Sequence, residues 1–180
     1  CRRQRQMCIR DSLLFEAKKK CIFLDAGTGS GCVGITIANE RPKWKVLLLE
    51  LYSEAIKVAK KNLKLCKKNN IELICADWLE PIAENSFDFI FSNPPYIRID
   101  DESIDNSVRC NEPFTSLFSR ENGLEDINKI IKYSQKVLST NGILFLENGT
   151  GQSKDISANL ELNDFTDIRV HIDYNDHERF

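Results

Sequence analysis

The sequence predicts an α/β fold in which a largely parallel sheet is covered by helices on both faces. Short apolar runs of strand length alternate along the chain with stretches whose apolar residues recur at helical spacing. A glycine cluster follows the first apolar run directly, and a polar segment with two prolines follows the fourth. Such alternation is typical of parallel sheets, because parallel strands are joined by helical crossovers.

The first predicted elements lie on either side of the glycine cluster. Cys21–Asp25 is a short apolar run and is predicted to be a buried strand. Cys32–Asn39 is predicted to be a helix that ends before Pro42, because proline cannot continue it. The second strand is predicted at Lys45–Glu50.

A strongly periodic helix is predicted at Ser53–Lys68, with Ser53 as its N-cap. Its apolar positions share one side, and six lysines lie mostly opposite: Lys57, Lys60, Lys61, Lys64, Lys67 and Lys68. The lysine face could bind RNA, but a solvated outer face is the preferred interpretation. The third and fourth strands are predicted at Ile71–Cys75 and Phe87–Ser92.

The second half of the chain opens with a long polar loop, Asn93–Gly123. Loops of this length inside a compact domain are usually functional. The remaining elements are predicted in the order helix, turn, strand, helix and strand: Asp126–Leu138, Asn141-Gly142, Ile143–Glu147, Lys154–Leu162 and Thr166–Ile172.

Composition and charge are those of an ordinary globular chain. The 180 residues are enough for one domain with a core, and 42% of them are hydrophobic and 29% charged. A net charge of -2 does not indicate a protein held to nucleic acid by bulk charge. No apolar run could span a bilayer, and no signal-peptide core is visible. We therefore expect a cytoplasmic protein with no membrane contact and no direct binding to nucleic acid.

The seven cysteines do not indicate a metal site. Their number is odd, none belongs to a C-x-x-C pair, and the chain has only two histidines. Four cysteines fall where core residues are expected: Cys21, Cys32, Cys66 and Cys75. We expect these four to be reduced, buried thiols and expect no bound metal.

The first residues differ in composition from the rest. Cys1–Ser12 is rich in arginine and glutamine and has no apolar period, and Met7–Asp11 looks like a translated sequencing-adapter remnant. We expect residues 1–19 to be a leader, either an artefact or a linker from an upstream domain, and residues 20–180 to form one domain.

The glycine cluster Gly27-Thr28-Gly29-Ser30-Gly31 suits a ligand that approaches the backbone closely. Glycines permit positive φ and carry no Cβ, and the following helix offers free N–H groups. Glu50 ends the next strand, 19 residues after Gly31, where an acid can accept hydrogen bonds from both hydroxyls of a ribose. The G-x-G-x-G spacing, in contrast to G-x-G-x-x-G, favours S-adenosylmethionine over NAD. A purely structural turn is the alternative.

Asp77-Trp78 follows the third strand, at a position that flanks an adenine pocket in this architecture. Asp77 could accept a hydrogen bond from the adenine amino group, and Trp78 could line the ring or offer its backbone N–H. The alternative is a turn aspartate beside a half-buried tryptophan.

Asn93-Pro94-Pro95-Tyr96 follows the fourth strand, at the same carboxyl edge as the glycine cluster. An amide nitrogen is a poor nucleophile because its lone pair is delocalised. Two acceptors aimed at its N–H bonds, the Asn93 side-chain oxygen and the Pro94 carbonyl, can hold it and relieve that delocalisation. Tyr96 can stack on a planar target. Asn93 cannot act as a base, so the catalytic role predicted for Asn93, Pro94 and Tyr96 is positioning. A Pro-Pro turn is the alternative.

Together these residues resemble the release-factor glutamine methyltransferase family. The matching segments are Leu24–Gly31, Glu50, Asp77-Trp78, Asn93–Ile97, Val108-Arg109, Glu112-Pro113, Glu147–Gly149, Asp173-Tyr174 and Glu178-Arg179. The resemblance covers roughly residues 20–180. Its Asn-Pro-Pro-Tyr motif is shared with adenine and other amino methyltransferases, whereas the Glu112-Pro113 loop and the C-terminal tail are more specific.

The resemblance implies a Rossmann-like class I methyltransferase fold and transfer of a methyl group from S-adenosylmethionine. It implies that the acceptor is the N5 amide of the glutamine in the Gly-Gly-Gln motif of a peptide chain release factor. It also implies that Asn93–Tyr96, Pro95 included, bind this glutamine, and that Gly27–Gly31, Glu50, Trp78 and Asn93 surround the cofactor.

Three features depart from the family pattern. The ribose-binding acid is often aspartate there and is Glu50 here. The family's N-terminal helical domain is absent from this sequence, and Phe180 falls where the last antiparallel strand should begin. Because that strand pairs with the sixth, we expect the sixth strand, Thr166–Ile172, to be poorly paired.

Other functions stay open at this point. A ribosomal-protein glutamine methyltransferase would use the same chemistry on another partner. An adenine N6-methyltransferase acting on RNA or DNA would be expected to carry a basic groove or an added nucleic-acid module, and neither is visible. A degenerate binding module is disfavoured by the intact Gly27–Gly31, Glu50 and Asn93–Tyr96.

Overall fold

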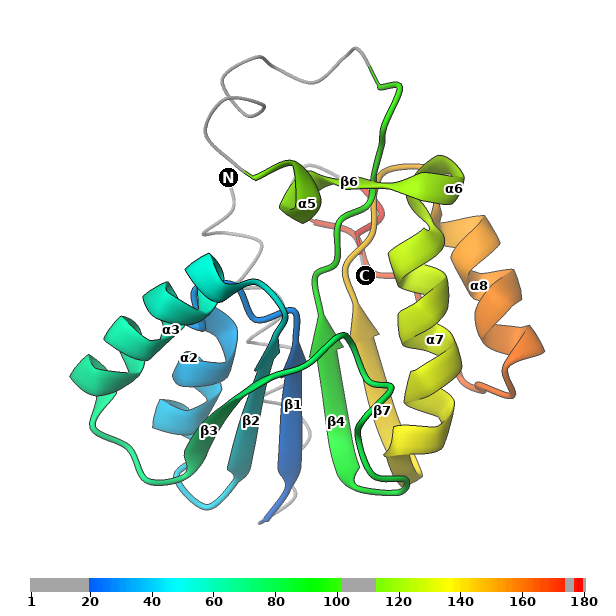
Figure 1. The fold of residues 1–180 in the computed structure, drawn as a ribbon. Coiled ribbons are helices and arrows are strands. Elements are labelled where there is room, and N and C mark those ends of the chain that lie inside the picture. Colours follow the sequence, from blue (N-terminus) through cyan, green and yellow to red (C-terminus); the bar gives the residue numbers. More distant parts are fainter. Residues whose placement is uncertain (1–19, 102–112, 174–176, 180) are drawn as a thin grey trace. The chain divides into compact units, whose positions relative to one another are not determined.

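A computed structural model describes residues 20–101, 113–173 and 177–179. Contacts divide the chain into two units. The sheet unit comprises residues 1–92 and 136–145, and the helical unit comprises residues 93–135 and 146–180. Each unit is described by itself (Figure 1).

The sheet unit is built on a five-stranded sheet with the order β3-β2-β1-β4-β7. The strands are β1 (Ile22–Ala26), β2 (Lys45–Glu50), β3 (Ile71–Cys75), β4 (Phe87–Ser92) and β7 (Leu138–Leu146). Parallel pairing joins β1 to β2, β1 to β4 and β2 to β3. The strand order reverses between β1 and β4, which is the edge position where ligands bind in open α/β sheets.

The strands form because their side chains bury a dense apolar core. Phe23, Leu24, Leu48 and Ile90 are at most 1% exposed. The Trp44 ring stacks on the Phe89 ring in β4, with centroids 5.3 Å apart. β2 and β4 are mostly buried apolar runs, as expected in a parallel sheet, whereas no residue of β3 is buried. The predicted bounds of β2, β3 and β4 are confirmed, and β1 is shifted by one residue.

Helices α2 (Cys32–Glu40) and α3 (Ser53–Cys66) contact each other, and both pack on β2 and β3. The predicted apolar and lysine faces of α3 are confirmed, since Ala59 is buried and all six lysines are exposed. Ser53 is not the N-cap: Tyr52 holds that position in extended conformation, and no side chain caps the helix. The helix ends before Lys67 because that residue has a left-handed φ of 50°.

The helical unit contains α7 (Glu125–Val137), α8 (Ser153–Leu162) and four short elements. The short elements are β5 (Ile97–Arg98), α5 (Phe114–Leu117), β6 (Phe118–Ser119) and α6 (Arg120–Gly123). β5 and β6 pair in parallel. The prediction of one long polar loop at Asn93–Gly123 is therefore wrong in part, because two-residue strands that pair 21 positions apart leave no periodic signal.

One face of α7 is fully buried, and its residues Ile127, Ile130, Ile131 and Ser134 recur at helical spacing. The predicted turn at Asn141-Gly142 is wrong. Both residues lie inside β7, which begins five residues earlier than predicted, and Asn141 takes a φ of 62° within the strand. Asparagine tolerates this conformation better than most residues.

The sixth predicted strand, Thr166–Ile172, does not form. In the described part of the tail there is only an isolated antiparallel bridge between Ile172 and Glu178. Residues 166–171 lie outside every ladder of the sheet. The His171 carbonyl accepts a hydrogen bond from Arg179 N–H at 2.9 Å, but the segment makes no ladder with a neighbouring strand, so the expected poor pairing is confirmed.

Two of the four cysteine predictions are wrong. Cys21 is buried and Cys66 is half-buried, but Cys32 and Cys75 are exposed. Cys32 starts α2 on its outer side, where the helical period carries it away from the sheet. Among the described residues, no helix combines the length and the hydropathy needed to cross a membrane.

Candidate active site

The glycine loop leaves β1 through three residues with positive φ: Gly27 at 72°, Gly29 at 58° and Gly31 at 80°. The N–H groups of Gly27 and Thr28 both donate to the carbonyl of Leu49, at 2.9 Å each. This pair of hydrogen bonds fixes the start of the loop against β2. A Cβ added at Gly29 would meet no atom within 4 Å, so open space lies beside the middle of the loop.

Asp25 organises this loop, although the sequence analysis gave it no role. Its carboxylate accepts hydrogen bonds from the Thr28 hydroxyl at 2.7 Å and from the Gly34 N–H at 2.9 Å. Burial raises the pKa of Asp25 to about 6 against these two hydrogen bonds, and the nearby charge of Glu50 adds to the rise. An acid inside an otherwise apolar strand was the signal that could have found it.

Glu50 lies at the end of β2, as predicted, and is 5% exposed. Its Oε2 accepts a hydrogen bond from Gly29 N–H at 2.8 Å, and its Oε1 accepts from Leu51 N–H at 2.9 Å and Tyr52 N–H at 3.0 Å. A carboxylate offers about four acceptor sites. Glu50 therefore joins the glycine loop to the start of α3 and retains capacity on Oε2.

Trp78 touches the same loop. A Cβ added at Gly27 would lie 3.0 Å from the Trp78 ring, which shows that the indole rests on the glycine. Trp78 itself is half-buried and has a φ of 44°. Asp77 is exposed, and Ser30 is also exposed, with its carbonyl accepting a hydrogen bond from the Asn62 side chain at 2.8 Å. The loop, Glu50 and Trp78 thus form one contiguous cluster.

The glycine loop and the Asn93–Tyr96 segment are both covalently attached to the carboxyl ends of paired strands, β1 and β4. Ala26 and Ser92 are register partners, and the Ser92 hydroxyl donates to the Ala26 carbonyl at 2.8 Å. These are the last residues of their strands. Gly27 and Asn93 each follow by one peptide bond, so the two motifs begin at adjacent points of the sheet edge.

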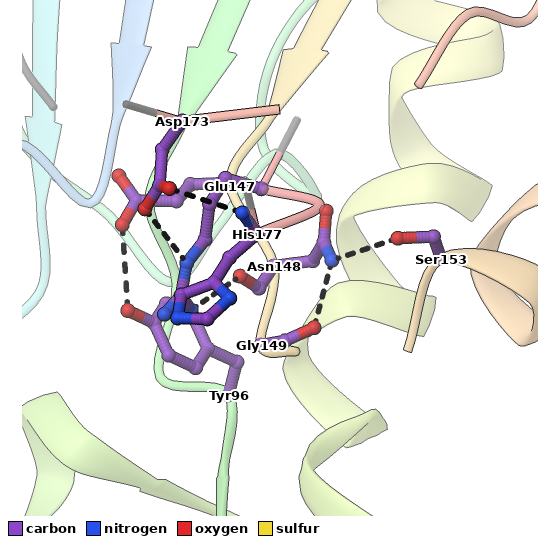
Figure 2. A network of polar contacts seen from close by, with 8 residues as sticks. Tyr96, Glu147, Asn148, Gly149, Ser153, Asp173 and His177 are labelled. Carbon is purple, nitrogen blue, oxygen red and sulfur yellow. Dashed lines mark hydrogen bonds and ion pairs between the residues drawn. The ribbon is translucent and has the colours of Figure 1, made fainter. Parts of the chain in front are cut away.

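The Asn93–Tyr96 segment belongs to the helical unit. Pro94 is buried, and Asn93, Pro95 and Tyr96 are half-buried. The Tyr96 hydroxyl lies 3.3 Å from Oε1 of Glu147 (Figure 2). The Tyr96 carbonyl accepts a hydrogen bond of 3.0 Å from Nε2 of Gln152. Gln152 stood in no predicted site, and only the folded chain brings it to Tyr96.

Several residues that carried the family resemblance lie outside the described residues: Val108, Arg109, Glu112 and Tyr174. Pro113 is exposed and precedes α5. In the tail, Asp173 is buried and pairs with Arg179 at 3.5 Å, whereas Glu178 is exposed.

These features define the class of the protein. A mostly parallel sheet carries a glycine loop after β1, an acid at the end of β2 and an Asn-Pro-Pro-Tyr segment after β4. This is the Rossmann-like fold of the class I methyltransferases.

Within this class, the chain belongs to the methyltransferase small domain family, whose model matches residues 12–108. A similar solved structure is that of Haemonchus contortus phospholethanolamine N-methyltransferase 2, in complex with phosphomonomethylethanolamine and S-adenosylhomocysteine. Its TM-score is 0.69 at 18% identity, over 93% of this chain and 38% of that one. At this identity the likeness shows the fold.

Two curated relatives share the name release factor glutamine methyltransferase. The protein of Francisella tularensis is 37% identical over 157 residues, which are 87% of this chain and 55% of the relative. The protein of Escherichia coli is 32% identical over 162 residues, which are 90% of this chain and 58% of the relative. The chain thus spans a little over half the length of these relatives.

Proposed function

We propose that the protein transfers a methyl group from S-adenosylmethionine to the N5 side-chain amide of the glutamine in the Gly-Gly-Gln motif of a peptide chain release factor. The observation that carries the proposal is the pairing of Ala26 with Ser92. The glycine loop, which suits a cofactor, follows Ala26, and the Asn93–Tyr96 segment, which suits an amide, follows Ser92. Both segments therefore start at the same edge of the sheet.

The residues of the glycine cluster fit the cofactor. Gly29 borders open space, and Glu50 retains acceptor capacity on Oε2. We assign the ribose hydroxyls to Glu50, the adenine surroundings to Asp77 and Trp78, and the amino acid part to the loop Gly27–Gly31 with Asn93. The bound cofactor supplies a methyl group made electrophilic by its positive sulfonium.

The Asn93–Tyr96 segment supplies the amide site. The Asn93 side-chain oxygen and the Pro94 carbonyl accept the two N–H bonds of the glutamine amide, and Tyr96 stacks on its plane. Since none of these groups is a base, the chain contributes orientation and preorganised acceptors. These acceptors would hold the amide nitrogen for attack on that methyl group, and after transfer the nitrogen would lose its proton to water.

The choice of a release factor is supported by two curated relatives named release factor glutamine methyltransferase, which are 32–37% identical over 87–90% of this chain. Termination of translation takes place in the cytoplasm, so the cytoplasm is the proposed location. Direct binding to nucleic acid is not part of the proposal, and the net charge of -2 agrees with this.

A methyl-transfer assay tests the function. Labelled S-adenosylmethionine is offered to the complete gene product with a full-length release factor, its Gly-Gly-Gln→Gly-Gly-Ala variant, ribosomal proteins or total RNA. Label on the native factor and not on the variant is expected. Label on ribosomal proteins or on RNA alone would show that the same chemistry serves another acceptor, and the release-factor proposal would be abandoned.

A further inference from the structure

Tyr96 is held at both ends by side chains of the helical unit. At one end its hydroxyl faces Oε1 of Glu147 at 3.3 Å (Figure 2). At the other end its carbonyl accepts a hydrogen bond from Gln152 at 3.0 Å. The first distance is longer than the usual 2.5–3.0 Å of hydroxyl hydrogen bonds. Contacts in active sites are often long without substrate and tighten when it binds.

The Glu147 carboxylate is buried and therefore requires hydrogen-bond donors. It follows β7 directly and is 3% exposed. A buried carboxylate is costly unless hydrogen-bond donors face it, and the Tyr96 hydroxyl is one such donor. The contact therefore favours one direction of the phenol ring.

Gln152 joins the Tyr96 backbone to a strained turn. Its Nε2 also donates to the Asn122 carbonyl at 3.2 Å, and its Oε1 accepts from Gly149 N–H at 2.8 Å. Asn122 and Gly123 have φ values of 58° and 85°, and a Cβ at Gly123 would lie 2.2 Å from the Tyr96 carbonyl oxygen. Strained backbone of this kind clusters at functional sites.

The tail fixes the segment that carries Glu147. Asn148 N–H donates to the Arg179 carbonyl at 2.9 Å, and Nη1 of Arg179 donates back to the Asn148 carbonyl at 3.3 Å. Nε of Arg179 lies 3.5 Å from Oδ2 of Asp173, and the Asn148 side chain donates to Ser153 at 3.2 Å (Figure 2). The hydrogen bonds of Asn148 therefore fix the backbone next to Glu147.

We propose that Glu147 and Gln152 are positioning residues that orient Tyr96 against the planar group that accepts the methyl. This inference rests on the proposed function and names two residues for it. The Tyr96 side chain has two torsions. The contact of its hydroxyl with Glu147 restricts the direction of the ring, and the contact of its carbonyl with Gln152 restricts the position of its backbone. Misplacement of a reacting group by about 1 Å can cost about 100-fold in rate.

A double-mutant cycle on the complete gene product tests the hydroxyl anchor. Glu147→Ala and Tyr96→Phe should each lower kcat about tenfold, with the Kd for S-adenosylmethionine changed by less than about twofold. The loss of kcat in the double variant should be no greater than the loss in the slower of the two single variants, because both changes remove the same contact. Glu147→Gln keeps an acceptor for the hydroxyl and should restore most of kcat. Additive losses would overturn the inference.

The backbone anchor is tested by Gln152→Glu. This change keeps an acceptor for Gly149 N–H but places a carboxylate oxygen against the carbonyl of Tyr96. We expect kcat to fall about tenfold while the melting temperature and cofactor Kd stay near wild type. Loss of melting temperature and cofactor affinity in step with kcat would show a merely structural role and overturn the inference.

An NMR readout separates this inference from the proposed function. In protein with ¹³C-labelled tyrosine, the Tyr96 ring signal is identified by its loss in Tyr96→Phe. It should shift or broaden in Glu147→Ala and stay unchanged in Glu161→Ala, a matched change at an exposed position of α8. An unchanged signal in Glu147→Ala overturns the positioning role. If the Tyr96 signal shifts in Glu147→Ala but the protein methylates no release factor, the proposed function is overturned instead.

Discussion

The amide of Gly29 donates a hydrogen bond of 2.8 Å to the carboxylate of Glu50. The middle of the glycine loop is therefore fixed by the same side chain that we assign to the ribose. Glu50 couples loop geometry to ligand binding, so its removal should affect both.

Glu50→Ala should raise the Kd for S-adenosylmethionine by at least about tenfold, because it removes the ribose acceptor and the partner of Gly29 N–H. The Kd can be measured by titration calorimetry. Glu54→Ala is a suitable control, since the Glu54 side chain is 81% exposed in an ion pair with Lys57. Unchanged affinity in Glu50→Ala would remove Glu50 from the site.

Asn93→Ala should lower turnover at least about 100-fold and change the cofactor Kd by less than about threefold, because the lost acceptor acts on the amide in the transition state. Single-turnover kinetics with saturating cofactor measures this. Asn69→Ala, at an exposed position, should leave both quantities unchanged. Loss of cofactor binding with normal turnover of the bound complex would contradict the assigned role.

Alanine at Gly27 and at Gly29 should have different effects, although both residues have positive φ. At Gly27 the new Cβ presses on the Trp78 ring at 3.0 Å, so the melting temperature should fall more. At Gly29 the Cβ enters open space that we assign to the cofactor, so affinity should fall more than stability. Thermal unfolding and calorimetry on the pair check this, and equal effects on both quantities would argue against the assignment.

Asp25 should make stability depend on pH. Its pKa is raised from 3.8 to about 6 in the folded chain, so the folded state keeps a proton between about pH 4 and pH 6 that the unfolded chain has lost. The contribution of Asp25 to the free energy of unfolding therefore declines as pH rises through this window, by about 3 kcal/mol at most.

Asp25→Asn removes that titration. The stability of the variant relative to wild type should rise between about pH 4 and pH 6 and then level off. Urea unfolding of both proteins at several pH values measures the difference. A difference that is constant over this range would mean that the Asp25 carboxyl is not the group that titrates.

Much of the fold could be read from local pattern. Mostly apolar runs set the bounds of β2 and β4, and the bounds of β3 also follow from its sequence although none of its residues is buried. Isoleucines at helical spacing form the buried face of α7. The strand pair β5 and β6 could not be read, because two residues at each site give no period and their pairing depends on the intervening chain.

The glycine loop, Glu50 and Trp78 were chosen from the sequence, and the structure brings them into one cluster. Asp25 stands out as an acid in an otherwise apolar strand, but its donors, the Thr28 hydroxyl and Gly34 N–H, are identified only in the folded chain. The contacts of Tyr96 with Glu147 and Gln152 join positions 51 and 56 residues apart.

By itself the sequence determined the alternation of strands and helices, because each element expresses its own apolar period and its own turn residues. It also determined which residue types stand at the ends of β1, β2 and β4. The tertiary structure alone decided which acids are buried and which donors reach them. Those partners are set by loop paths and by the register of non-adjacent segments, and such long-range contacts have no signature in local sequence.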